Sequence, residues 1–205
     1  MKRSLRISVI LLFASLQIVA CGRTIIVNSW TDVTYDGPPL KKVLVVGIDY
    51  YASDSKLFEA SFVNQFREYG LEALGFSTTT RGDGRATATR VKAVALEQGC
   101  DMVFSVRKVR VSGGSVVPKT VYPPPSFDLN IAYEDLLLPM KSTEFEISTK
   151  HLQMENTLYD VKKNKIIWRA LSDTIEDESM NAFLKGLSLT VIEDLQKKGL
   201  VSRFR

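Results

Sequence analysis

The stretch that decides the fold is VLVVGIDYYASDSKLFEASFVNQFREYGLEALGFS, residues 43–77. It begins with an almost continuous apolar run at 43–48, which is typical of a strand covered on both faces. Serine and aspartate at 53–55 are residues that cap helices. The aromatic side chains that follow recur at helical spacing: Phe58, Phe62, Phe66 and Tyr69. Because Gly70 is a typical helix stop, a second strand is expected over 71–77.

The rest of the chain continues this alternation. A helix is expected over about 87–98 and a third strand over 102–111. Residues 145–161 and 166–172 flank a polar turn and predict a hairpin, and an amphipathic helix is expected over about 179–198. The sequence therefore predicts an α/β fold, β-α-β-α-β followed by a β-hairpin and a C-terminal helix. The strands would form one mixed sheet packed with helices, an α/β sandwich.

Length and composition exclude several classes of protein. The chain has 205 residues, of which 45% are hydrophobic and 24% charged, so one globular domain is expected. Its two cysteines cannot build a disulfide scaffold. Its single histidine, His151, excludes a multi-histidine metal site and most histidine-based catalysis. We expect no enzyme activity, no catalytic residue, no metal and no cofactor.

The N-terminus has the pattern of an export signal. Lys2, Arg3 and Arg6 precede an uncharged, mostly apolar stretch at 7–20, which is shorter than a mature membrane-spanning helix. It ends in IVACG at 18–22. This string resembles the lipobox of bacterial lipoproteins. The resemblance implies cleavage before Cys21 and acylation of Cys21, with palmitate among its lipids, and Gly22 in place of Asp implies sorting to the outer membrane.

This signal divides the chain and changes its charge. We expect a lipoprotein signal peptide at 1–20, an N-terminal tether at 21–40 and a single α/β domain at 41–205. A Pro-rich insertion interrupts that domain at about 113–142. Removing three basic residues from 27 leaves 24 against 23 acidic ones, so the net charge falls from +4 to +1. Nucleic acid is therefore not an expected partner.

Several strings in the domain resemble one group of bacterial envelope lipoproteins. They are KKVLVV at 41–46, the helix with Phe58 and Glu59 that ends at Gly70, GCDMV at 99–103, and the hairpin LYDV at 158–161 with KIIWRA at 165–170. The group includes the curli secretion lipoprotein CsgG, the LpoB-type activators of penicillin-binding proteins and the N-terminal domain of TolB. The resemblance implies an α/β sandwich in the periplasm, with an envelope protein or peptidoglycan as partner.

Asp49, Tyr50 and Tyr51 are the candidate ligand-binding residues. They follow the first predicted strand, and ligands of open α/β sheets gather at that edge. A plain polar strand end that leads into a helix is the simpler interpretation. The GDGRAT string at 82–87 departs from the dinucleotide fingerprint at its third position, and a flexible loop is the simpler interpretation there too.

The remaining chemically distinctive residues have simple structural interpretations. We expect His151 on a strand surface, Cys100 as a buried thiol and Trp168 in the core. Arg107, Lys108 and Arg110 form a local basic edge, which could meet anionic lipid or peptidoglycan or could simply be a polar strand face.

The expected function is that of a membrane-anchored, non-enzymatic binding or assembly module in the cell envelope. The lipid anchor would hold it at the bacterial membrane, most naturally the outer membrane, facing the periplasm. The insertion at 113–142 is the first candidate for the binding surface, because long loops on rigid scaffolds often carry function. Two alternatives remain open: a small-ligand-binding lipoprotein that uses the edge at Asp49, and a component of a secretion pore, although no pair of channel-forming hairpins is evident.

Overall fold

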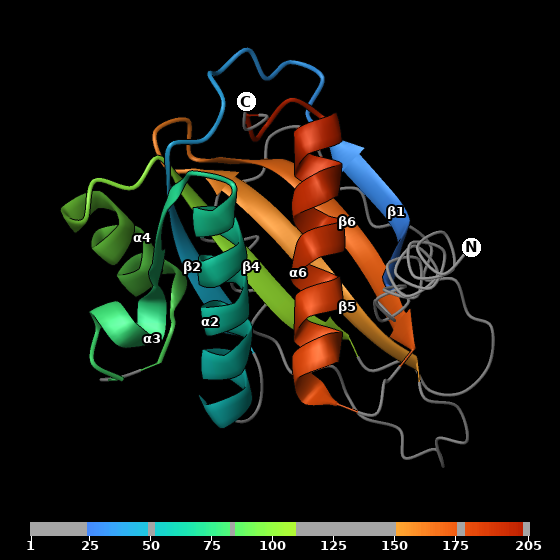
Figure 1. Cartoon of the computed structure of the whole chain (residues 1–205). Helices are drawn as coiled ribbons and strands as arrows, with labels where there is room; N and C mark the ends of the chain where they lie inside the picture. The colour runs from blue at the N-terminus through green and yellow to red at the C-terminus, as the bar shows by residue number, and fades with distance from the viewer. Residues whose placement is uncertain (1–23, 49–51, 83–84, 110–150, 176–178, 203–205) are drawn as a thin grey trace, which may run out of the picture.

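The computed structural model describes residues 24–48, 52–82, 85–109, 151–175 and 179–202. This part of the chain forms one six-stranded mixed sheet and four helices (Figure 1). Helices lie on both faces of the sheet, so the predicted α/β sandwich is confirmed. The predicted sites at Cys21 and at 49–51, the signal peptide at 1–20 and the insertion at 113–142 lie outside the described residues.

The elements follow the predicted order after an additional first strand. They are β1 (Thr24–Thr31), β2 (Lys42–Ile48), α2 (Ala52–Glu68), β3 (Glu72–Gly75), α3 (Phe76–Thr79), α4 (Ala88–Glu97), β4 (Met102–Val109), β5 (His151–Asp160), β6 (Lys165–Ile175) and α6 (Met180–Lys197). The strands lie in the order β1-β6-β5-β4-β2-β3. Strand β2 pairs in parallel with β3 and β4, and the other neighbours are antiparallel.

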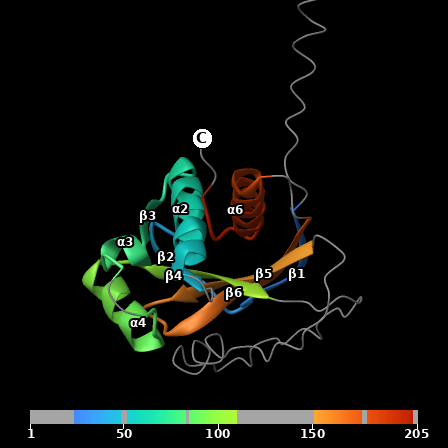
Figure 2. The same ribbon diagram turned by 90° about the horizontal axis from the view of Figure 1, so that it is seen from below.

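The larger core lies between the sheet and helices α2 and α6, which lie side by side on one face (Figure 2). Phe104 of β4 is at its centre, 4.7 Å from Phe62 and 5.3 Å from Phe66 between ring centroids. Trp168 is fully buried, as predicted, and its Nε1–H donates to Asp194 Oδ2 at 3.0 Å. These aromatic contacts join α2, β4, β6 and α6 in one packed layer.

A smaller core lies on the opposite face, between helices α3 and α4 and the sheet. Leu44 and Val46 of β2 point to this face, while Val43 and Val45 point to the larger core. The apolar run is therefore buried on both faces, as its composition predicts. Helix α4 is capped by Thr87, whose side chain accepts a hydrogen bond from the Arg90 N–H.

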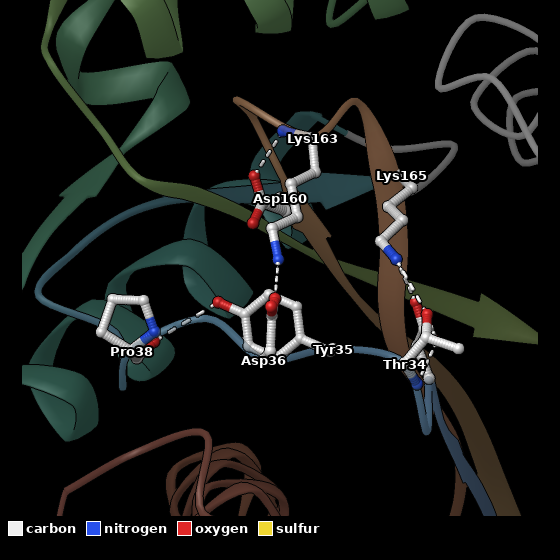
Figure 3. A network of polar contacts seen from close by, with 8 residues as sticks. Thr34, Tyr35, Asp36, Pro38, Asp160, Lys163 and Lys165 are labelled. Atoms are coloured by element: carbon white, nitrogen blue, oxygen red, sulfur yellow. Dashed lines mark hydrogen bonds and ion pairs between the residues drawn. The ribbon is translucent and has the colours of Figure 1, made fainter.

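Strand β1 is the main difference from the expected organisation. The sequence places 21–40 in a tether, but Thr24–Thr31 form an edge strand paired with β6. In the following segment, Thr34, Tyr35 and Asp36 pack on the turn between β5 and β6 (Figure 3), and the Leu40 N–H donates to the Leu200 oxygen. There, the Lys163 ammonium group lies 4.7 Å from the centroid of the Tyr35 ring, and Lys165 pairs with Asp32. Thr24–Thr31 are thus part of the sheet of the domain.

Smaller differences concern the ends of elements. The strand expected over 71–77 ends at Gly75, and α3 begins at Phe76. Helix α2 begins at Ala52, so residues 53–55 lie within its first turn. Residues 145–150, expected in the hairpin, lie outside the described residues. Among the described residues, no helix combines the length and apolar character needed to cross a membrane.

Candidate functional site

The segments predicted to be functional are all connected to strands at the same end of the sheet. Strand register places Ile48 opposite Arg107 and His151 opposite Ile175, while Thr24 lies opposite Thr174. The ends of β2, β4 and β6 and the starts of β1 and β5 therefore lie together (Figure 1). We call this region the loop-bearing end, defined by Thr24, Ile48, Val109, His151 and Ile175.

The predicted ligand edge and the Pro-rich insertion attach to the same end. Asp49 follows Ile48 directly in the chain, and the residues at 113–142 are inserted between Val109 and His151. Cys21 precedes Thr24 by three residues. Segments that are far apart in the sequence are therefore connected to the same end of the sheet. The sequence predicted each segment but could not predict that they would share an end.

Strand β2 also forms a topological switch point at this end. The chain passes from β2 to β3 on one side and returns to β4 on the other. Helix α2 packs on one face of the sheet and α4 on the opposite face. In open α/β sheets, ligands bind outside the carboxyl ends of strands at such a point. The predicted ligand edge follows β2 directly in the chain, but Asp49, Tyr50 and Tyr51 lie outside the described residues, so the ligand edge stays a prediction.

The carboxylate of Glu59 accepts hydrogen bonds from both the end of β2 and the start of α3. Its Oε1 accepts hydrogen bonds from the Gly47 N–H at 3.2 Å and the Ser77 Oγ at 3.1 Å, and its Oε2 accepts the Ser77 N–H at 2.8 Å. The side chain is buried, and its pKa is raised because desolvation outweighs these hydrogen bonds. The Glu59 carboxylate thus holds the backbone two residues before the predicted ligand edge.

Position 47 has room only for glycine, because the backbone of α2 lies too close for a side chain. A Cβ atom at this position would lie 2.4 Å from the backbone oxygen of Ser55 in α2. The close approach of β2 and α2 brings the Gly47 N–H within reach of Glu59. No role for Glu59 was evident from the sequence. The sequence feature that marks Glu59 is its position. It is an acidic residue one helical turn before Phe62 and Val63, on the buried side of the helix.

A second polar cluster lies on the sheet face opposite α2 and α6. Glu155 of β5 accepts a hydrogen bond from Arg107 Nε at 3.1 Å, and its other carboxylate oxygen lies 3.3 Å from Arg169 Nε. The three side chains are 14–19% exposed. Gln153 Nε2 also donates to Asp173 Oδ2 at 3.3 Å on the same face. Two arginine side chains in this cluster therefore share the single carboxylate of Glu155.

The predicted basic edge is divided by this arrangement. Arg107 and Lys108 are neighbours in β4, so their side chains point to opposite faces. Arg107 pairs with Glu155, whereas Lys108 is exposed. Arg110 lies outside the described residues. Arg107 and Lys108 thus do not form a shared basic surface.

Cys100 has the inert environment expected of a buried thiol. It is 4% exposed, and burial raises its pKa to about 11. The thiol therefore stays protonated at neutral pH and is a weak nucleophile. His151 begins β5, in agreement with its expected place in a strand.

The GDGRAT string has a structural role in its described part. Gly82 has a φ of +72°, a conformation that favours glycine, and Thr87 caps α4. Asp83 and Gly84 lie outside the described residues. Within the described chain, no three His, Cys, Asp or Glu residues are grouped as metal ligands would be.

Comparisons with known proteins give only distant matches. No protein-family model matches the sequence, and no curated protein matches it. Among solved structures, a PelC dodecamer from Paraburkholderia phytofirmans is 11% identical with a TM-score of 0.47, covering 89% of this chain and all of that one. Lipoprotein GNA1162 from Neisseria meningitidis is 13% identical with a TM-score of 0.41, covering 77% of this chain and 99% of that one.

A PDZ domain protein from Parabacteroides distasonis is also similar. It is 12% identical with a TM-score of 0.42, and the match covers 94% of this chain and 40% of that one. At such identities and scores, these likenesses carry no argument about function. None of the three tests the resemblance to the CsgG, LpoB and TolB groups.

Proposed function

We propose that this protein is a lipid-anchored lipoprotein of the bacterial cell envelope, which acts as a non-enzymatic binding or assembly module. The lipobox-like string at 18–22 supports the anchor. The gathering of the predicted segments at the loop-bearing end supports the binding role. The partner is an envelope protein or peptidoglycan, and the protein faces the periplasm from the outer membrane, as the resemblance to the CsgG, LpoB and TolB groups implies.

The observation that carries this proposal is the shared end of the sheet. A lipid on Cys21, the long insertion and the Asp49 edge all connect to the same end of a rigid scaffold. Long loops on rigid scaffolds are well suited to binding, because the scaffold holds their ends at fixed positions. The Glu59 hydrogen bonds contribute to that rigidity at the end of β2.

Radiolabelled palmitate tests the anchor in bacterial cells that express the full chain. We expect the wild-type protein and Cys100→Ala to incorporate label, and Cys21→Ala to incorporate none. Cys100 is the matched control because it is the only other cysteine. Label on Cys21→Ala, or no label on the wild type, would refute the anchor.

The binding role is tested by crosslinking in the envelope. Deleting residues 115–140 should remove the crosslinked partners while the thermal unfolding midpoint stays close to that of the wild type. The same partners captured by the deletion variant would contradict a binding role for the insertion.

A small-ligand-binding lipoprotein is the second candidate, and the switch point at β2 favours it. A ligand that binds the native state raises the unfolding midpoint. A thermal-shift screen should then find a compound that stabilises the wild type more than Asp49→Asn. Equal shifts for both proteins would argue against the Asp49 edge. The secretion-pore alternative rests on the resemblance alone.

A further inference from the structure

We propose that the loop-bearing end lies against the surface of the bilayer that holds the Cys21 lipid, with the turn at 162–165 pointing away from it. This inference rests on the proposed lipid anchor and adds an orientation. The described residues at this end would then face the lipid surface, and the insertion at 113–142 would bind its envelope partner close to the membrane. Three observations support this orientation: the short spacing between Cys21 and Thr24, the attachment of β1 to the sheet, and the positions of exposed apolar residues.

The anchor site and the first strand are close together in the chain. Cys21 and Thr24 are three residues apart, so even a fully extended chain places their Cα atoms at most about 11 Å from each other. A lipid on Cys21 therefore keeps Thr24 within roughly the thickness of the headgroup region of the membrane surface. A long flexible tether would leave the domain free to rotate, but this spacing does not provide one.

Thr24 is attached to the domain through β6. Thr24 pairs with Thr174 of β6, and their hydroxyl oxygens are 2.8 Å apart. The pairing continues along β1 to Thr31, and the Asp32 N–H then donates to the Ile167 oxygen at 2.9 Å. Because β1 is held along its length, the position of Thr24 determines which end of the sheet faces the membrane.

The turn at 162–165 lies at the end of the sheet opposite the loop-bearing end. Strand β6 has 11 residues and runs from Lys165 to Ile175. At the usual rise of a strand, its two ends are separated by about 30 Å. The turn at 162–165 is thus far from the membrane when Thr24 is near it. The two ends of the domain can therefore be distinguished by a surface probe.

Exposed apolar side chains occur near the strand and helix ends that would face the membrane. Ile25 and Val27, at the start of β1, are 60% and 42% exposed, and Met180, at the start of α6, is 54% exposed. Ile25 and Val27 follow Thr24 within three residues, and Met180 follows Ile175 by five residues, so all three are close in the chain to the loop-bearing end. Apolar side chains at a lipid interface gain from removal from water. They would strengthen the contact that the short anchor imposes.

The test uses the lipidated full-length precursor, matured in cells and reconstituted in vesicles of phosphatidylethanolamine and phosphatidylglycerol. The vesicles also contain lipids with a fluorescence quencher on the headgroup. A thiol-reactive fluorophore is placed on Lys108→Cys, near the loop-bearing end, or on Lys162→Cys, in the distant turn; both lysines are exposed. The buried Cys100 thiol does not compete for the label.

We expect quenching to be severalfold stronger at position 108 than at position 162. Equal quenching, or stronger quenching at 162, would overturn the orientation. The palmitate experiment separates the two proposals. A protein without palmitate refutes the anchor, whereas a palmitoylated protein with equal quenching refutes the orientation alone and leaves a protein partner for this end.

A pair of matched variants tests the apolar contact. Ile25→Lys and Val33→Lys each replace an exposed apolar residue, but Val33 lies beyond the far end of β1. We expect Ile25→Lys to reduce quenching at position 108, while Val33→Lys leaves it unchanged. The same result for both variants would overturn the contribution of β1 to the contact.

Discussion

The Ser77 N–H donates a hydrogen bond to Glu59 Oε2 at 2.8 Å, and this contact joins the start of α3 to the middle of α2. The same carboxylate accepts the Gly47 N–H, so one buried side chain holds the turn after β3 and the end of β2. Buried acceptors of this kind are costly to remove, because the donors they serve lose their partners.

Glu59→Gln should therefore destabilise the domain. The glutamine amide keeps one acceptor oxygen and presents an NH2 group to backbone donors, so we expect a loss of about 1–3 kcal/mol in the free energy of unfolding. Urea denaturation measures this loss. Glu97→Gln, at the exposed end of α4, is the control and should cause little change. Equal stability of the two variants would contradict the role of Glu59.

The raised pKa of Glu59 predicts a pH dependence. Above the ordinary carboxyl pKa of 4.5, the unfolded state releases this proton while the folded state still holds it. The contribution of Glu59 to stability is thus complete below that pH and declines as pH rises through the folded-state pKa. The difference in unfolding free energy between the wild type and Glu59→Gln should fall over this window. A difference that grows with pH would show that the pKa of Glu59 is lowered.

Glu155→Gln should destabilise the domain because it removes a carboxylate that two largely buried arginines share. The change leaves Arg107 and Arg169, both less than 20% exposed, without their shared carboxylate. Removing one partner of a fully buried ion pair costs about 3–5 kcal/mol, so we expect a smaller loss in the free energy of unfolding for this partly buried cluster. The control is Asp36→Asn, which removes the exposed pair with Lys163 and should leave urea denaturation unchanged. A Glu155→Gln variant as stable as Asp36→Asn would contradict this account of the cluster.

The Cys100 thiol should be protected in the native protein. Its burial and a pKa of about 11 predict very slow reaction with a disulfide reagent at neutral pH. In denaturing urea, the same thiol should react rapidly. The Cys21→Ala variant isolates this signal, because Cys100 is then the only thiol. Fast labelling of the native variant would show that the site opens or that the thiol is activated.

The sequence predicts those elements whose signals are local. The helix expected over 87–98 is observed as Ala88–Glu97, and that expected over 179–198 as Met180–Lys197. Both are bounded by a capping residue and a following glycine, which act within one turn of the chain. The buried β2 strand was equally clear, because its apolar run needs no partner to be recognised.

The structure differs from the prediction where distant residues decide the outcome. Strand β1 pairs with β6, so Thr24 and Thr174 meet across 150 positions of sequence. Strand β3 ends at Gly75 in the structure, and α3 then begins where the Ser77 N–H meets the Glu59 carboxylate. The pairing of Arg107 with Glu155 likewise depends on the register of β4 and β5, which a single sequence does not specify.

The most direct test of the central claim is the mass of the N-terminal peptide from protein extracted from bacterial envelopes. We predict a chain that begins at Cys21 and carries a diacylglyceryl group on its sulfur, with palmitoyl chains among the attached lipids. A chain that retains Met1, or one that begins elsewhere with an unmodified Cys21, would contradict the lipoprotein account.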